Sequence, residues 1–222
     1  MRRAIAIFAF YMAAAGAPRV CSGSAAPPQS ARVVDRIVAR IEGDIILQSQ
    51  VRELGAFQQL IDGHAESDDK LLEELIEQWI VETEATASHF PPAAKSEVDR
   101  ELLRISQQFP SPEKYAARLN ELGLSANQVR QLLTRQIYVE RYVDYKFRPS
   151  VQIEPADIDA YYQKELLPEL AKNNQPAPNR AEVEEQIREV LIQRGISDLT
   201  AKWLDDTKSR LKIEIEAEGG KP

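Results

Sequence analysis

The sequence has little of what most catalytic and metal sites require. Its 222 residues include one cysteine, Cys21, and two histidines, His64 and His89. A lone cysteine cannot form a disulfide within the chain, and neither histidine has a further ligand at the spacing of a zinc site. No glycine-rich phosphate loop and no Gly-x-Ser-x-Gly turn occurs. We therefore expect no catalytic residue, no metal and no cofactor.

A hydrophobic run long enough to span a membrane is also missing. The apolar run at residues 4–15, AIAIFAFYMAAA, is shorter than the roughly 20 residues that cross a bilayer. Arg2 and Arg3 precede it and small residues follow it, which is the layout of a secretory signal peptide. We predict a signal peptide over residues 1–25, cleavage near residues 24–26, and a periplasmic mature protein. The alternative is a buried N-terminal helix.

Cys21 raises the possibility of a lipoprotein, in which that cysteine would be acylated. The preceding Pro18, Arg19 and Val20 match a lipobox poorly. Without residues 1–25 the chain has no thiol, which suits an oxidising compartment, and its formal charge changes from −7 to −10. This acidity disfavours nucleic acid and anionic membrane surfaces as partners. We expect no stable membrane insertion after cleavage.

Both ends of the mature chain contain strand patterns. Ile37, Ala39 and Ile41 alternate with other residues, and Gly43 lies between this run and a second β-prone run at residues 45–47; the pattern predicts a hairpin. Residues 211–216 (LKIEIE) alternate strictly. A lone strand needs a partner, so we predict that 211–216 joins the hairpin.

The segment between these strands has helical periodicity, so the predicted fold class is mainly α. Helices are predicted at 50–60, 69–87, 96–109, 112–122, 126–147, 155–166 and 180–210, and residues 168–179 are predicted to be a loop. Ser49 and Ser96 are predicted caps for the first and third helices. The acid pairs Asp68-Asp69 and Glu73-Glu74 are interpreted as a solvated helix face. Gly195 lies on the apolar stripe of the last helix and predicts that another helix crosses there, the alternative being a tolerated glycine or a kink.

Four segments resemble the SurA family of periplasmic chaperones. They are VDRIVARIEGDIILQSQV at 34–51, LLEELIEQWIVET at 71–83, IEPADIDAYYQKE at 153–165 and EVEEQIREVLIQRGISDLTAKWLDDTKSRLKIEI at 182–215. The resemblance implies a SurA N-terminal-like helical module with a small hairpin. It implies a holdase for unfolded exported proteins, with outer-membrane proteins as the expected clients.

The chain departs from that family where a parvulin-type isomerase domain usually lies. Such a domain needs on the order of 90 residues, whereas 14 residues separate Glu165 from Arg180. We therefore expect no isomerase domain and no enzyme activity. The expected organisation is a signal peptide at 1–25, a hairpin and helical module at 26–150, a linker region with a short helix at 151–179, a closing helix and strand at 180–216, and a tail at 217–222.

Aromatic residues near the end of the 126–147 helix are the candidate binding site. Aromatic rings bury a large area and accept varied partners, so the predicted peptide-binding residues are Tyr138, Tyr142, Tyr145, Phe147 and Trp203. The alternative for them is core packing. A groove between the helical lobe and the closing helix is expected to bind clients without ATP. Alternative functions are a peptidyl-prolyl isomerase and an assembly subunit with one dedicated partner, and exchange of the closing helix could form a homodimer.

Overall fold

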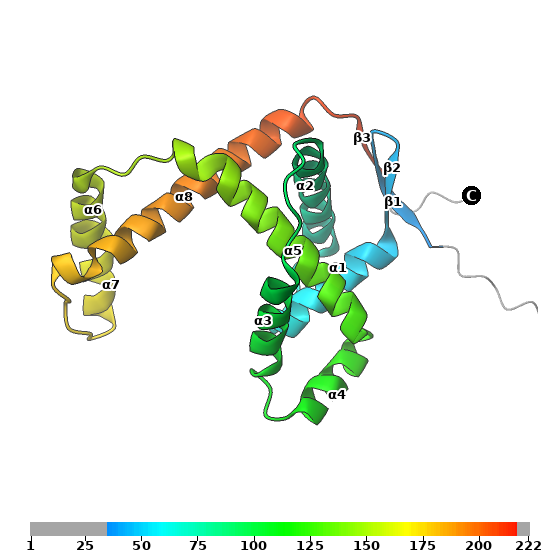
Figure 1. Ribbon diagram of the computed structural model, residues 1–222, viewed down its shortest axis with the longest axis horizontal. Coiled ribbons are helices and arrows are strands. Elements are labelled where there is room, and N and C mark those ends of the chain that lie inside the picture. The colour runs from blue at the N-terminus through cyan, green and yellow to red at the C-terminus, as the bar shows by residue number, and fades with distance from the viewer. Residues whose placement is uncertain (1–34, 217–222) are drawn as a thin grey trace, which may run out of the picture. The chain divides into compact units, whose positions relative to one another are not determined.

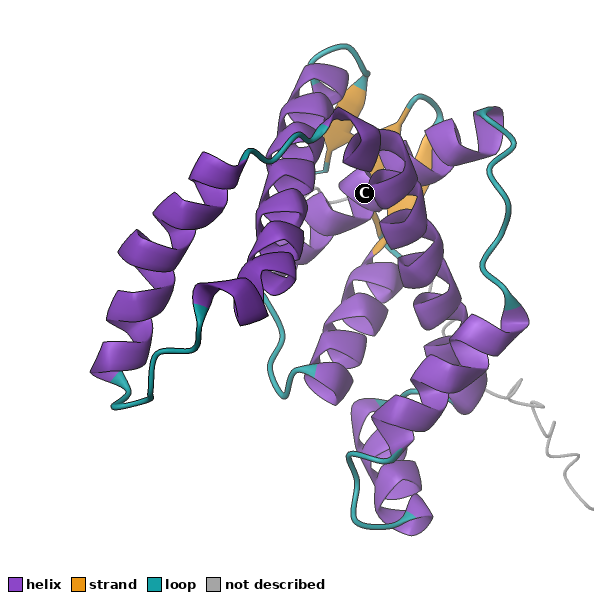
Figure 2. Cartoon of the chain, turned by 60° about the vertical axis from the view of Figure 1, so that its left-hand side comes forward, coloured by secondary structure: helices purple, strands orange, loops and turns teal. Residues whose placement is uncertain are grey.

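The computed structural model describes residues 35–216, which are mainly α-helical with one small antiparallel sheet (Figure 1). This confirms the predicted fold class. The predicted signal peptide at residues 1–25, Cys21 and the predicted tail at 217–222 lie outside the described residues. Helices account for most of the described chain, and the strands lie together in the sheet (Figure 2).

The sheet joins the two ends of the described chain, as the sequence predicts. Strands β1 (Ile37–Ile41) and β2 (Asp44–Leu47) form a hairpin. Glu42 and Gly43 between them have φ values of 50° and 104°, which suit a tight hairpin turn. Strand β3 (Ile213–Ile215) pairs antiparallel with β1, so the strand order is β2-β1-β3. The central strand is therefore completed by residues from the far end of the sequence.

Ten helical segments connect the hairpin to β3. They are α1 (Gln48–Ile61), α2 (Asp68–Ala87), α3 (Lys95–Ser106), α4 (Pro112–Leu122), α5 (Ala126–Phe147), the 3₁₀ turn η1 (Arg148–Ser150), α6 (Pro155–Tyr161), the π-helical turn η2 (Tyr162–Leu166), α7 (Leu167–Lys172) and α8 (Arg180–Lys208). Ser125 caps α5 by accepting from the N–H of Gln128, and Gly123 ends α4 with a φ of 67°. These two boundaries follow directly from the sequence.

Two predicted caps are wrong, because the helices begin earlier than Ser49 and Ser96. The N–H of Leu47 donates to the Gln50 side chain, and the N–H of Ala94 donates to Glu97, both at 2.8 Å. In each case the side chain of the third helical residue accepts a hydrogen bond from the backbone N–H of the residue just before the helix. The Ser49 hydroxyl is free to donate to the carboxylate of Asp35.

The loop predicted at 168–179 is wrong at its start, where α7 continues to Lys172. Pro168 lies in a stretch that is helical from α6 through α7. Proline has no N–H and its ring crowds the preceding turn. The chain widens there into the π-helical turn η2, in which the N–H of Leu167 donates to the carbonyl of Tyr162. This widening keeps the helix intact across a residue that was expected to end it.

Among residues 35–216 the buried apolar side chains form two clusters. The first contains the sheet, α1, α2 and the C-terminal parts of α5 and α8, with Ala39 and Ile41 of β1 wholly buried. The second joins α1, α3, α4 and the N-terminal half of α5 around Ile105 and Val129. Helices α1 and α5 contribute to both clusters, so they connect the two halves of the core.

Helix α8 runs from α6, past the end of α5, to α2 (Figure 1). Its residues Arg180, Glu189 and Lys208 form ion pairs with Asp159, Arg148 and Glu77, respectively. The close approach predicted at Gly195 is present, but the neighbour is a side chain of an extended segment rather than a helix. A β-carbon at Gly195 would lie 2.7 Å from Cγ1 of Val151. Glycine therefore allows α8 to lie against the residues that follow η1.

Candidate functional site

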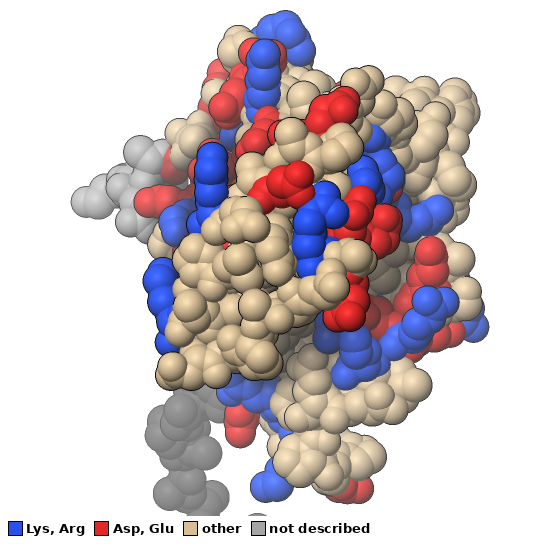
Figure 3. Space-filling model, turned by 90° about the vertical axis from the view of Figure 1, so that its left-hand side faces the viewer, with Lys and Arg blue, Asp and Glu red and all other residues tan. Residues whose placement is uncertain are grey.

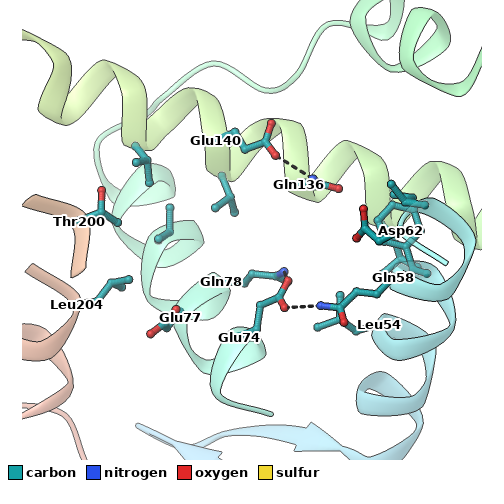
Figure 4. Close-up of a pocket in the computed structure, with 16 residues that line it drawn as sticks. Leu54, Gln58, Asp62, Glu74, Glu77, Gln78, Gln136, Glu140, Thr200 and Leu204 are labelled. Carbon is teal, nitrogen blue, oxygen red and sulfur yellow. Dashed lines mark hydrogen bonds between the residues drawn. The ribbon is translucent and has the colours of Figure 1, made fainter. Parts of the chain in front are cut away.

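A groove between α1, α2, α5 and α8 is one of several hollows in the described chain (Figure 4). It has a volume of about 370 Å³, within the range of small ligand sites. We call it the central groove. Its apolar lining includes Leu54 and Phe57 of α1, Val81 of α2, Val139 and Val143 of α5, and Leu204 of α8.

Helical spacing explains why this lining is continuous. On α5, Leu132, Val139 and Val143 are separated by seven and four residues, and on α1 the groove residues Leu54, Phe57 and Ile61 are separated by three and four. These intervals place each set on one helix face. The two faces lie across the groove from one another, so the groove is an opening between apolar stripes that elsewhere pack as core.

Carboxylates surround the apolar floor. Asp62, Glu74, Glu77 and Glu140 line the groove, and no Lys, Arg or His of the described part of the chain lies in its lining. Glu77 accepts from Nζ of Lys208 at 2.7 Å. Among the described residues, the other three form no ion pair: Glu74 accepts from the Gln58 and Gln78 amides, and Glu140 accepts from Gln136. Most of the negative charge of the groove is therefore uncompensated.

The pKa of the Glu74 carboxyl is raised. Burial is the main cause, and the negative charges of Glu77 and Asp62 add to it, while hydrogen bonds from the Gln78 and Gln58 amides oppose it. Across the groove, Glu140 adds another acid on α5. The ionised form of Glu74 is thus kept in an unfavourable environment.

Glu74→Gln is expected to increase the free energy of unfolding at pH 7 by about 0.5 kcal/mol. The folded-state pKa of Glu74 lies above the unfolded-state value, so its contribution to stability is full at low pH and is lost as the pH rises through the folded-state pKa. The gain should disappear at about pH 3, where Glu is protonated in both states. Urea unfolding of the wild type and of Glu74→Gln at pH 7 and at about pH 3 measures this difference in the free energy of unfolding.

The matched control is Glu66→Gln. Lys70 lowers the pKa of Glu66 by its hydrogen bond and its charge, so Glu66 stabilises the fold above its unfolded-state pKa and loses this contribution as the pH falls. Removing that carboxylate should leave stability at pH 7 unchanged or reduced. A Glu74→Gln protein less stable than wild type at pH 7 would contradict a raised pKa of the Glu74 carboxyl in the folded state.

The structure divides the five predicted binding residues into two groups. Tyr138, Tyr142 and Tyr145 surround Phe90, with ring centroids 5.8, 5.3 and 5.2 Å from its centroid. Phe147 instead packs on Trp203 at 5.7 Å, which joins α5 to α8. None of the five lines the central groove. Their role in peptide binding stays a prediction.

The burial of these five side chains differs strongly. Tyr142 is 4% exposed and Phe147 9%, whereas Tyr145 is 66% exposed. The Tyr142 hydroxyl donates to Glu84 at 3.1 Å, and Lys146 lies over the Trp203 ring with Nζ 4.7 Å from the centroid. Tyr142, Phe147 and Trp203 thus connect α2, α5 and α8. Tyr138 and Tyr145 keep ring surface that a ligand can reach.

A second, wider hollow lies beside Tyr138. Phe90, Pro91, Pro92 and Tyr138 form its apolar part and Arg135 is on its margin. It differs from the central groove in carrying arginine and no carboxylate among its lining residues. Its apolar residues come from the α2–α3 connection and one face of α5, so helices do not enclose it as they do the central groove.

The surface near α6 and α8 has alternating charges. Acidic and basic side chains lie next to one another in Figure 3, and Arg148 pairs with Glu189 while Arg194 pairs with Glu165. Hydrogen bonds from Arg148 lower the pKa of Glu189 to about 2. Glu189 and Glu165 thus have basic partners, whereas Asp62, Glu74 and Glu140 of the central groove form no ion pair among the described residues.

The sequence interpretation expected a groove between the helical lobe and the closing helix, but it did not identify the residues that line the central groove. Glu74 was assigned to a solvated helix face, but it lies half-buried and its side chain faces the groove. No local signal identified it, because acids also lie next to buried residues elsewhere on the helices, as Glu97 directly precedes the buried Val98.

Comparisons with known proteins assign no family. A scan against protein-family models and a search of curated proteins find no match for this chain. Within residues 35–216, no group of three or more His, Cys, Asp or Glu side chains is arranged to hold a metal ion, and no helix has the length and hydropathy of a membrane span. The resemblance to the SurA family stays a prediction.

Proposed function

We propose that this protein is a periplasmic holdase that binds unfolded segments of exported proteins, with outer-membrane proteins as the expected clients, in the central groove. The observation that supports this most directly is an open apolar groove whose walls come from α1, α2, α5 and α8. Export to the periplasm rests on the signal-peptide pattern of residues 1–25. The client class rests on the resemblance to the SurA family.

The chemistry of the groove favours weak and exchangeable binding. A volume of about 370 Å³ accommodates a few side chains of an extended segment at a time. Burial of aliphatic surface is non-directional, so many different sequences can be bound. Covering apolar segments and strand edges prevents clients from pairing with one another. Release then needs only transfer to a tighter partner, without ATP and without covalent chemistry.

Suppression of aggregation tests this function. An unfolded outer-membrane β-barrel precursor is diluted from urea into buffer with the mature chain, residues 26–222, and light scattering is followed. Thr200 lines the groove on α8, and Thr200→Arg places a long side chain into it. We expect this variant to need a several-fold higher concentration for half-maximal suppression. Ser197→Arg, at an exposed position on the same helix, adds the same charge and should behave as wild type.

Three results would contradict the proposal. Equal suppression by Thr200→Arg and wild type would exclude the central groove as the binding site. Acceleration of prolyl isomerisation in an unstructured proline peptide would favour the isomerase alternative instead. A single stoichiometric partner, with no suppression across several clients, would favour a dedicated assembly subunit.

A further inference from the structure

We infer that the central groove selects client segments in which Lys or Arg lies next to aliphatic residues. This inference rests on the proposed function, because it names the class of segment that the groove prefers. It is carried by the combination of an apolar floor with carboxylates on several sides and, within residues 35–216, no basic residue in the lining.

The carboxylates come from different elements and therefore surround the opening (Figure 4). Asp62 directly follows α1, Glu74 and Glu77 lie on α2, and Glu140 lies on α5 across from them. A cation that enters the groove is near an acid from either wall. An extended segment can therefore place a basic side chain at either margin while its aliphatic neighbours contact the floor.

The hydrogen bonds that Glu74 and Glu140 already accept leave their negative charge available to a bound cation. Gln58, Gln78 and Gln136 donate neutral amide hydrogens to Glu74 and Glu140, which orients the carboxylates without neutralising them. Lys208 is shared between Glu73 and Glu77. A ligand cation would supply the opposite charge that these acids lack, and charge-assisted hydrogen bonds are the stronger kind.

Lysine and arginine also fit the apolar floor. Their methylene stems lie along apolar surface while the charged group reaches polar surroundings. Here the stem would contact residues such as Val139 and Leu204, and the head would reach Glu140 or Glu74. An acidic segment would instead bring like charges together in a partly buried site, which opposes binding.

Three labelled peptides provide the test. All three contain the same aliphatic residues, and these are flanked by two Lys in the first peptide, two Ser in the second and two Glu in the third. Fluorescence anisotropy with the mature chain at low salt is expected to give the tightest binding for the Lys peptide and the weakest for the Glu peptide. Asp62→Asn combined with Glu140→Gln should weaken binding of the Lys peptide by about three- to tenfold. Binding of the Ser peptide should stay nearly unchanged.

The control variant distinguishes the groove from general attraction to an acidic protein. Glu182→Gln with Asp206→Asn changes the net charge equally at two exposed positions on α8 outside the groove. It should leave the preference for the Lys peptide intact. An equal loss in both double variants would overturn the inference, because long-range charge would then explain the preference.

The inference and the proposed function fail in different ways. If all three peptides bind equally, and Thr200→Arg abolishes their binding, the groove binds clients without charge selection and only the inference is overturned. If none of the peptides binds and the protein does not suppress aggregation, the proposed function itself is overturned. Binding of the Glu peptide tighter than that of the Lys peptide would contradict the inference directly.

Discussion

Trp203→Ala is expected to lower the free energy of unfolding by about 3 kcal/mol. Trp203 packs against Phe147 of α5 and lies under Nζ of Lys146, whose carboxylate partner is Glu84 of α2. Removing the indole leaves a cavity at the contact of three helices, and it exposes part of the first apolar cluster. Urea unfolding followed by far-ultraviolet circular dichroism measures the change.

The matched control for this substitution is Tyr145→Ala. Tyr145 belongs to the same predicted binding set, but its ring is 66% exposed, so its removal should change stability by about 0.5 kcal/mol or less. Together, Trp203→Ala and Tyr145→Ala distinguish a packing role of the aromatic residues from a role in client binding. A Trp203→Ala protein as stable as wild type, with impaired client binding, would show that Trp203 serves binding rather than the docking of α8.

The packing of α8 against α5 also affects the central groove. Thr200 and Leu204, on either side of Trp203, form the α8 wall of the central groove. Trp203→Ala is therefore expected to reduce client binding indirectly, by loosening that wall. Thr200→Arg changes the groove directly, so the two variants together distinguish loss of the wall from occupation of the groove.

Local patterns were sufficient to predict most of the fold. The alternation from Ile37 to Ile41 and the glycine at position 43 predict the hairpin, and Ser125 with the α5 stripe predicts the longest helix before α8. The pairing of β3 with β1 followed from a general rule, because a terminal strand with alternating residues requires a partner. These features depend on neighbours in sequence or on a small number of possible partners.

Features that depend on tertiary packing could not be predicted. Periodicity identifies the apolar face of a helix, but it does not show whether a neighbouring helix covers that face, so it did not identify the residues that line the central groove. It also placed Tyr142 and Tyr145 in one site, although α5 buries the first and exposes the second. The continuation of the helix through Pro168 depends on a π-helical turn, which no local sequence pattern predicts.

Ile213→Asp is expected to lower the free energy of unfolding by about 2–3 kcal/mol. Ile213 pairs with Ile41 of β1, which is wholly buried, and packs against the first apolar cluster. An aspartate there would place a charge without a basic partner beside Ile41. The expected result is release of β3, which exposes the edge of β1 and favours pairing with other chains.

Ile215→Asp is the matched control, because it makes the same change two residues along the same strand. Ile215 pairs with Ala39 but is 65% exposed, so its charge stays in water and stability should change by about 0.5 kcal/mol or less. Urea unfolding gives the free energies, and light scattering at rising protein concentration reports edge pairing. Equal stability of the two variants would mean that β3 contributes little to the closure of the fold. A loss confined to Ile213→Asp would show that one half-buried residue of β3 holds the C-terminal strand, and with it the end of α8, against the hairpin.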